Sequence, residues 1–256
     1  MESIIFLFTA SLLAGIFNGV AGGGGLIAFP ALLITGVPAI NANATNAAAL
    51  WFGTVASTIA YRREFSTPRK SLLLLSCVSF LGGIIGSYLL LHTSQARFSG
   101  LIPYLMLIAT LLFIVSPALI KWLNKRSLNS SNFRLPLVII LPLQLVIAIY
   151  GGYFGGGSGI LMLAALNLMG MQNIHSLNAY KSWLATCINA AAIIHFTFAN
   201  KIVWLQVIVM ASGAVIGAYS SIYLARKLHP FWIRSFIIGV GLSMTCYFFI
   251  KQANPI

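Results

Sequence analysis

The chain has 256 residues, of which 59% are hydrophobic and 7% are charged, and its mean hydropathy is +0.96. No water-soluble fold of this size needs so much apolar sequence, and several runs of 19 or more residues carry no charge. The sequence therefore predicts a polytopic helical membrane protein. The formal net charge of +13 does not indicate a nucleic-acid partner, because the cations lie in short segments between apolar runs.

Acidic side chains are nearly absent. Only Glu2 and Glu64 are acidic, and neither lies within an apolar run. Proton and metal-cation carriers usually hold their ion with buried carboxylates, so we expect an anionic or neutral cargo, no metal site and no cofactor. The cysteines fall in apolar runs without CxxC spacing, and we expect small buried hydrophobic side chains at Cys77, Cys187 and Cys246.

Two glycine-rich segments interrupt the apolar sequence. They are Gly19–Gly25 (GVAGGGG) and Gly151–Gly159 (GGYFGGGSG), and four glycines of one match four of the other at a separation of 133 residues. Glycine weakens a helix by about 1 kcal/mol relative to alanine, so each cluster predicts a break in a helix. A repeated break indicates a membrane transporter built from two related halves.

The first half begins with two apolar arms, Ile4–Phe17 and Leu26–Ile34, on either side of the first break. As helices these arms would be roughly 14–21 Å long, which is too short to cross a hydrocarbon core of about 30 Å. We therefore expect a re-entrant hairpin, and two tilted crossings are the alternative. The first arm lacks a preceding basic region, so we treat it as mature sequence. Full helices are expected at Asn43–Tyr61, Ser71–Leu91 and Ser99–Ile120.

The second half repeats this order, and Gly36 matches Gly170, as Asn43-Ala44 matches Asn178-Ala179. The fold class is thus an all-α polytopic membrane protein with two homologous halves, residues 1–126 and 127–256, in one membrane domain. The Ser/Asn-rich stretch Ser127–Asn132 is the expected linker. The expected arms and helices of this half are Leu135–Tyr150, Ile160–Met169, Ser176–Ala199, Val203–Ala225 and Trp232–Ile250.

The number of crossings decides the symmetry. With re-entrant hairpins each half crosses three times, and tandem halves with an odd number of crossings form an inverted repeat, which we prefer. Placing the N-terminus outside then leaves three outer cations, Arg97, Lys201 and Lys251, as the positive-inside rule favours. Four crossings per half would instead give parallel repeats, with ten cations inside and four outside. The eleven inner cations of the inverted arrangement are Arg62, Arg63, Arg69, Lys70, Lys121, Lys125, Arg126, Arg134, Arg226, Lys227 and Arg234.

Polar side chains within the apolar sequence cluster around the two breaks. Backbone N–H groups at a glycine-rich tip followed by a helix N-terminus form an anion cradle. Helix capping is the alternative role for each Asn or Ser. Other polar residues nearby are Asn41, Asn43, His175, Ser176 and Ser182. We expect the substrate to bind at Asn18, Gly22, Gly23, Gly24, Gly25, Thr45, Asn46, Gly155, Gly156, Gly157, Ser158, Asn178 and Lys181.

Lys181 is the only cation inside an expected span, where it either faces an anion site or extends to the membrane interface. His195, deeper in the same helix, is expected to be a neutral packing residue, and a proton relay is the alternative. Gly156-Gly157-Ser158-Gly159 also matches the G-x-S-G pattern of rhomboid intramembrane proteases, with His195 as the nominal base. The first copy has Gly25 where the second has Ser158, so the repeat explains this loop without a nucleophile.

Several motifs point to a known family. They are Gly22–Gly25 followed by Leu-Ile, Pro30, the turn Gly36-Val37-Pro38, Ala44–Asn46 and the weaker second copy at Gly155–Gly159. With these motifs the chain resembles the TauE/SafE sulfite-exporter family. The second copy departs from the pattern, since Tyr180-Lys181 stands where the first copy has Thr45-Asn46. The resemblance implies an inner-membrane permease for sulfite, sulfonates or related organosulfur anions.

We therefore expect a secondary transporter of a small anion that works by alternating access. An anion channel is the alternative. The expected partners are the small anionic substrate and the lipid bilayer, without nucleic acid, and a homo-oligomer is compatible with this interpretation.

Overall fold

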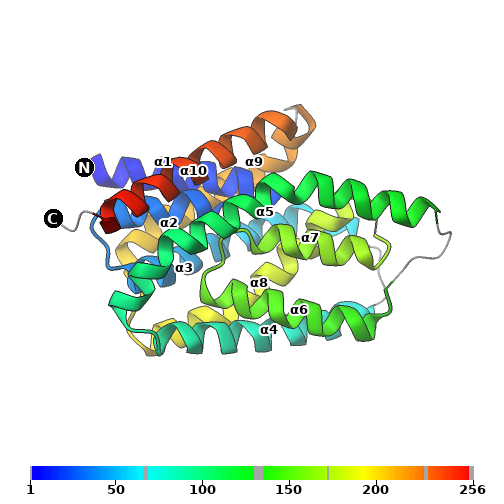
Figure 1. Ribbon diagram of the computed structural model, residues 1–256, viewed down its shortest axis with the longest axis horizontal. Coiled ribbons are helices and arrows are strands. Elements are labelled where there is room, and N and C mark those ends of the chain that lie inside the picture. The colour runs from blue at the N-terminus through cyan, green and yellow to red at the C-terminus, as the bar shows by residue number, and fades with distance from the viewer. Residues whose placement is uncertain (1, 66–68, 130–134, 172, 228–229, 254–256) are drawn as a thin grey trace.

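The computed structural model describes residues 2–65, 69–129, 135–171, 173–227 and 230–253, and these residues form ten α-helices and one 3₁₀ turn without a strand (Figure 1). The helices run roughly along the long axis of the molecule. Their bounds are α1 Glu2–Ala21, α2 Gly25–Ile34, α3 Ala39–Ala60, η1 Arg62–Glu64, α4 Arg69–Leu91, α5 Gln95–Asn129, α6 Leu137–Tyr153, α7 Ser158–Leu168, α8 Ile174–Phe198, α9 Trp204–Lys227 and α10 Pro230–Ala253.

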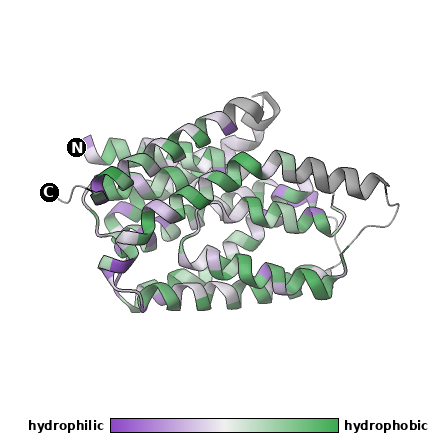
Figure 2. Ribbon diagram, viewed as in Figure 1, coloured by the Kyte–Doolittle hydropathy of each residue, from purple (hydrophilic) through white to green (hydrophobic). Residues whose placement is uncertain are grey.

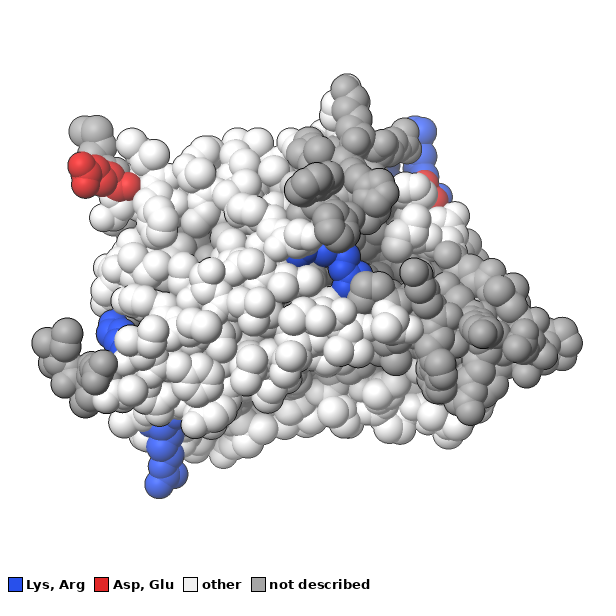
Figure 3. Space-filling model, turned by 45° about the horizontal axis from the view of Figure 1, so that its top comes forward, with Lys and Arg blue, Asp and Glu red and all other residues white. Residues whose placement is uncertain are grey.

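Five helices are long and apolar enough to cross a membrane: α1, α4, α5, α9 and α10. Figure 2 shows hydrophobic residues along α4, α5 and α6, and Figure 3 shows a surface with few charged side chains and large areas that carry none. α3 and α8 are also long, with 22 and 25 residues, but neither contains a stretch as continuously apolar as those five, and they pack against each other. Most polar residues of these two helices are buried, among them Asn43, Asn46, Asn178 and Lys181, as in a multi-pass membrane protein.

Several expected boundaries were wrong. α1 has 20 residues and continues past Phe17 to Ala21, because single glycines within a packed helix are tolerated. It is therefore about 30 Å long and not the short arm expected. α5 continues past Ile120 to Asn129, so Lys121, Lys125 and Arg126 lie on a helix rather than in a loop. The first part of the expected linker, residues 127–129, therefore also lies on α5. Residues 130–134 lie outside the described part of the chain.

The expectation of three buried cysteines was also wrong. Cys77 and Cys246 are exposed on the protein surface, and Cys187 is half-buried. Cys77 and Cys246 lie on helices long and apolar enough to span a membrane, where lipid covers a small apolar side chain as well as protein does.

The short helices α2 and α7 end in the same way. Gly36 and Gly170 follow them with φ of +85° and +88°, in the left-handed region that glycine adopts readily. After each glycine the next N–H bonds back to the helix, from Val37 to Leu32 O and from Met171 to Leu166 O. This is the Schellman pattern, so the match between Gly36 and Gly170 in sequence is also a match in backbone conformation.

The two broken segments approach from opposite ends of the molecule (Figure 1). α1 starts at the end where the N-terminus lies and α2 returns toward that end, whereas α6 and α7 enter and leave at the other end. α1 packs beside α9 and α6 beside α4, while α3 packs on α9 and α8 on α4. Exchanging the two halves therefore reproduces the same set of helix pairs.

Small residues permit the closest of these contacts. On α9, a Cβ at Gly213 or Gly217 would overlap the α1 backbone, and on α4 a Cβ at Gly82 or Gly86 would overlap α6. Paired glycines four residues apart let membrane helices approach until their backbones touch. The same device thus attaches each broken helix to a long helix of the other half.

Candidate functional site

The two glycine-rich breaks touch each other in the middle of the molecule. Gly22 has φ of +81°, and a Cβ built on it would lie 2.8 Å from the Cα of Gly159. A Cβ on Gly159 would lie 2.7 Å from the Cα of Gly22, and one on Gly25 would lie 3.5 Å from the Cα of Gly156. Since real Cβ atoms do not approach backbone this closely, the contact between the breaks requires glycine at both Gly22 and Gly159.

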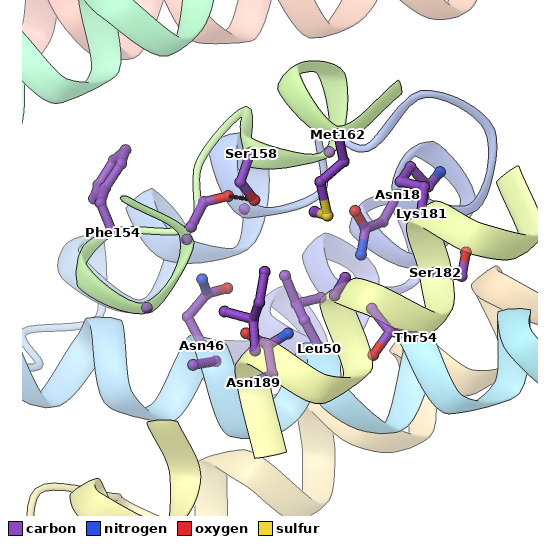
Figure 4. Close-up of a pocket in the computed structure, with 18 of the residues that line it drawn as sticks. Asn18, Asn46, Leu50, Thr54, Phe154, Ser158, Met162, Lys181, Ser182 and Asn189 are labelled. Atoms are coloured by element: carbon purple, nitrogen blue, oxygen red, sulfur yellow. Dashed lines mark hydrogen bonds between the residues drawn. The ribbon is translucent and has the colours of Figure 1, made fainter. Parts of the chain in front are cut away.

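A cavity of about 50 Å³ lies beside this contact (Figure 4). A single water needs roughly 10–15 Å³ of such space, so the cavity can hold a few waters or one small oxyanion. Its walls come from the ends of α1 and α6, the starts of α2 and α7, and the facing sides of α3 and α8. The lining residues are Asn18, Gly25, Asn43, Asn46, Ala47, Leu50, Thr54, Gly151, Gly152, Phe154, Gly155, Ser158, Gly159, Met162, Lys181, Ser182, Ala185, Ile188 and Asn189.

Lys181 brings the only charged side chain to this lining, and it is 2% exposed. Its Nζ donates to the carbonyl oxygens of Asn18 (2.7 Å) and Gly19 (3.3 Å) and to Asn178 Oδ1 (3.0 Å). The ammonium group therefore stays inside the protein and does not reach the membrane interface. All three N–H donors of the ammonium group are thus engaged, and two of them cap the C-terminal end of α1. The same group adds a positive charge to the cavity wall.

Four helix ends converge on the cavity. α1 and α6 present their C-terminal ends, which carry partial negative charge, and α2 and α7 present their N-terminal ends, which carry partial positive charge. Gly25 and Gly159 line the cavity at these N-terminal ends, and their N–H groups donate to no group in the described chain. Such free N–H groups at a helix start are suited to an anion.

Six of the residues expected from the sequence line the cavity: Asn18, Gly25, Asn46, Gly155, Ser158 and Lys181. The remaining glycines lie behind it and serve packing. Gly22 meets Gly159, Gly23 faces the ring of Phe113, and Gly24 faces the backbone of α1.

Gly156 accepts a 2.6 Å hydrogen bond from the Tyr150 hydroxyl at its carbonyl oxygen, and Gly157 packs against Ala109. Thr45 lies outside the cavity as well, and its Oγ1 accepts a 3.0 Å hydrogen bond from the N–H of Val203, just before α9. Asn178 does not line the cavity either, and its Oδ1 accepts a hydrogen bond from Lys181 Nζ. These expected site residues support the breaks or the helices beside the cavity instead of lining it.

Part of the cavity lining on α3 and α8 was not expected from the sequence. Thr54, Ser182 and Asn189 face the cavity but were not among the expected site residues. A helical spacing could have found them, since Asn43, Asn46, Leu50 and Thr54 recur every three or four residues and so share one helix face. Lys181, Ser182, Ala185, Ile188 and Asn189 follow the same rule on α8.

The serine and histidine considered for a protease do not meet. Ser158 Oγ donates a 2.9 Å hydrogen bond to the carbonyl oxygen of Gly155. His195 Nδ1 lies 2.9 Å from Ser87 Oγ on α4, and His195 does not line the cavity. Because Ser87 Oγ donates to the carbonyl oxygen of Gly83, it can accept from His195 Nδ1, and this contact joins α8 to α4.

Comparison with known proteins finds a family and relatives that match almost the whole chain. The family described as Sulfite exporter TauE/SafE matches residues 7–248. The chain is 26% identical over 254 residues to the "Probable membrane transporter protein ORF9" of Sinorhizobium sp, covering 99% of this chain and 95% of that protein. It is 28% identical over 246 residues to a "Probable membrane transporter protein" of Haemophilus influenzae, covering 96% and 94%.

A third relative is the "Probable membrane transporter protein YfcA" of Escherichia coli strain K12, which is 28% identical over 240 residues, or 93% of this chain and 87% of that protein. No solved structure matches the chain significantly. The relatives and the ten packed helices of the described chain together identify a membrane transporter. The chain belongs to the Sulfite exporter TauE/SafE family, whose sequence pattern covers nearly its whole length.

Proposed function

We propose that the protein is a secondary transporter of a small anion, and that its cargo is sulfite or a related organosulfur anion. The observation that carries this proposal is the central cavity, which has one buried cation, Lys181, and no acidic side chain in its wall. The family name supports sulfite as the first anion to test.

The charges around the cavity favour an anion over a cation as the main cargo. Moving an ion out of water costs several kcal/mol unless the new site replaces its hydration shell with oriented polar groups. Lys181 and the starts of α2 and α7 supply positive potential, and amide groups of Asn18, Asn46 and Asn189 supply hydrogen-bond donors. The volume of about 50 Å³ suits a small oxyanion better than a large organic substrate.

The halves are proposed to be inverted repeats that rock about the two breaks, which opens the cavity to one side of the membrane at a time. The opposite entry of α1–α2 and α6–α7 supports this arrangement. With the N-terminus outside, the cation-rich ends of α3 and α5 face the cytoplasm of a cell whose inner membrane holds the protein.

Cysteine labelling tests this orientation. After replacement of Cys77, Cys187 and Cys246 by serine, a single cysteine replaces either Ser94, before α5, or Arg63, after α3. Both positions are exposed. In intact cells or spheroplasts a membrane-impermeant maleimide should label the Ser94→Cys protein and spare the Arg63→Cys protein until the membrane is opened. The reverse pattern, or equal labelling, contradicts the orientation.

Flux measurements test the transport itself. Purified protein in liposomes should take up radiolabelled sulfite in a saturable manner, and sulfite loaded inside should accelerate the entry of labelled sulfite. A channel would show neither saturation at low concentration nor this acceleration. Thiosulfate, sulfate and short sulfonates, added as competitors, identify the preferred anion.

A pair of asparagine variants connects flux to the cavity. Asn18→Ala removes a lining amide but keeps the backbone carbonyl that Lys181 binds, and it should raise KM about tenfold, the effect of losing one polar contact. Asn167→Ala on α7 removes an amide outside the cavity and should leave KM unchanged. Equal effects of the two variants would exclude the cavity as the binding site.

A further inference from the structure

Positions beside the cavity that match between the two halves carry different residues. Since Gly19 matches Gly152 in sequence, Asn18 matches Gly151, and both pairs lie in the last turn of a broken helix. On the central helices Asn43 matches Asn178 and Asn46 matches Lys181. The three acceptors of the Lys181 ammonium group therefore have three counterparts, but the residue that matches Lys181 is Asn46, which carries no positive charge.

The oxygen atoms that match the acceptors of Lys181 have no hydrogen-bond donor among the described residues. Within the described chain no hydrogen bond reaches the carbonyl oxygens of Gly151 and Gly152. Asn46 is 4% exposed, and its Oδ1 has no partner among the described residues. Asn43 is held at its other end, since its Nδ2 donates 3.0 Å to the carbonyl oxygen of Tyr153. All four residues line the cavity, and Figure 4 shows Asn46 directed into it from α3, on the side away from Lys181.

We propose that a sodium ion binds between the end of α6 and Asn46, where it takes the place that the Lys181 ammonium group takes at the end of α1. The ligands are the carbonyl oxygens of Gly151 and Gly152 and the side-chain oxygens of Asn43 and Asn46.

The chemistry of these oxygens selects a monovalent cation. The C-terminal end of a helix carries a partial negative charge, and buried oxygens without a donor are unfavourable unless a donor or a cation meets them. Hard cations prefer oxygen ligands, but divalent ones are normally held by carboxylates, and the described chain has no cluster of three acidic, histidine or cysteine side chains. In transporters with broken helices, the C-terminal ends of half-helices and unwound carbonyls are the usual ligands of Na⁺.

The cation is then held in the cavity wall by its oxygen ligands and the anion occupies the cavity itself, each at the helix ends that suit its charge. Na⁺ at the end of α6 adds a second positive charge beside the anion, opposite Lys181. That this cation travels with the anion rests on the proposed transport function. The binding of Na⁺ itself does not.

Thermal unfolding of the purified protein in detergent tests the site without any transport. At constant ionic strength, replacing choline chloride by NaCl should raise Tm in a saturable manner, because a ligand that binds only the folded state stabilises it. KCl should not reproduce the shift. Absence of a Na⁺-dependent shift, or an equal shift with KCl, overturns the assignment, and a bound water in place of the ion would give this result.

Three variants locate the effect. Asn46→Ala should abolish the Na⁺-dependent shift. Gln206→Ala removes the other buried amide oxygen without a partner among the described residues, outside the cavity, and should keep the shift. Asn46→Lys places an ammonium group opposite Gly151 and Gly152. It should unfold in choline chloride near the Tm of the wild type in NaCl, and it should not respond to Na⁺. An Asn46→Lys protein that folds and still responds to Na⁺ overturns the proposal.

The two proposals fail in different ways. If Na⁺ raises Tm but no sulfite flux is found in liposomes, the cation site stands and the proposed cargo is wrong. If sulfite flux is found but neither flux nor Tm depends on Na⁺, the transporter stands and the cation site is wrong.

Discussion

Lys181 Nζ donates a 2.7 Å hydrogen bond to the carbonyl oxygen of Asn18, across 163 positions of sequence. That carbonyl lies in the last turn of α1, and it also accepts a 3.1 Å hydrogen bond from the N–H of Gly22, where the helix breaks. Lys181 on α8 thus caps the C-terminal end of α1. The end of α1 and the positive charge of the cavity wall depend on the same side chain.

Replacing Lys181 by methionine should affect both stability and flux. The variant keeps most of the volume but leaves the carbonyl oxygen of Gly19 buried without its donor, which costs about 1–3 kcal/mol. The carbonyl oxygen of Asn18 loses one of its two donors and keeps the N–H of Gly22. We expect a lower Tm in detergent and no sulfite flux in liposomes. Asn178→Ala removes one acceptor and keeps the charge, so its effect on flux should be much smaller. Wild-type flux in Lys181→Met would contradict the role of the charge.

Alanine at the contact between the two breaks should disrupt the protein. Gly22→Ala places a Cβ 2.8 Å from Gly159 and forces a left-handed φ on alanine, and Gly159→Ala creates the reverse overlap. Each strain of this kind costs about 1–3 kcal/mol, so Tm and the yield of folded protein should fall. The matched control is Gly239→Ala on α10, where no atom lies within 4 Å of the added Cβ. That variant should unfold at or slightly above the wild-type temperature.

Arg234 on α10 compensates for a proline on α5. Pro117 has no N–H to donate to the carbonyl oxygen of Phe113, one helical turn earlier, and Arg234 donates to that oxygen and to Ser116 Oγ (2.8 Å). Arg234→Met should therefore lower the stability by about 1–3 kcal/mol. Adding Pro117→Ala restores a backbone donor and should recover part of the loss. A double-mutant cycle on Tm measures this coupling, and strictly additive effects would contradict it.

Neighbouring residues on α3 should have separable roles. Thr45 bonds the N–H of Val203 and does not line the cavity, so Thr45→Val should lower stability by about 1 kcal/mol and leave KM for the anion unchanged. Asn46→Ala should instead change KM, because its side chain lines the cavity. Measurements of Tm and of concentration-dependent flux on both variants distinguish the two roles. A raised KM in Thr45→Val would place Thr45 in the binding site.

Much of the fold could be predicted from local sequence. The glycine clusters identified the breaks because glycine is the residue least compatible with a continuous helix. The lengths of α1 and α5 could not be predicted in this way. Packing against α9 stabilises the glycine-containing end of α1, which this sequence would not hold in a helix by itself.

The candidate site was predicted only in part. The polar clusters near each break led to Asn18, Asn46 and Lys181, which do line the cavity. Thr45 and Asn178 have the same chemical character and lie in the same clusters, but they face other partners. Residue type alone does not distinguish these cases, because adjacent positions on a helix differ in direction by about 100°.

The sequence by itself determined that this is a helical membrane protein with two glycine-rich breaks, because hydropathy and glycine content act locally along the chain. Only the tertiary structure decided that Gly22 meets Gly159, that Lys181 caps α1, and that Asn46 lines the same cavity as the end of α6. These relationships join residues more than 100 positions apart, and they depend on how the helices pack rather than on the preference of any one segment.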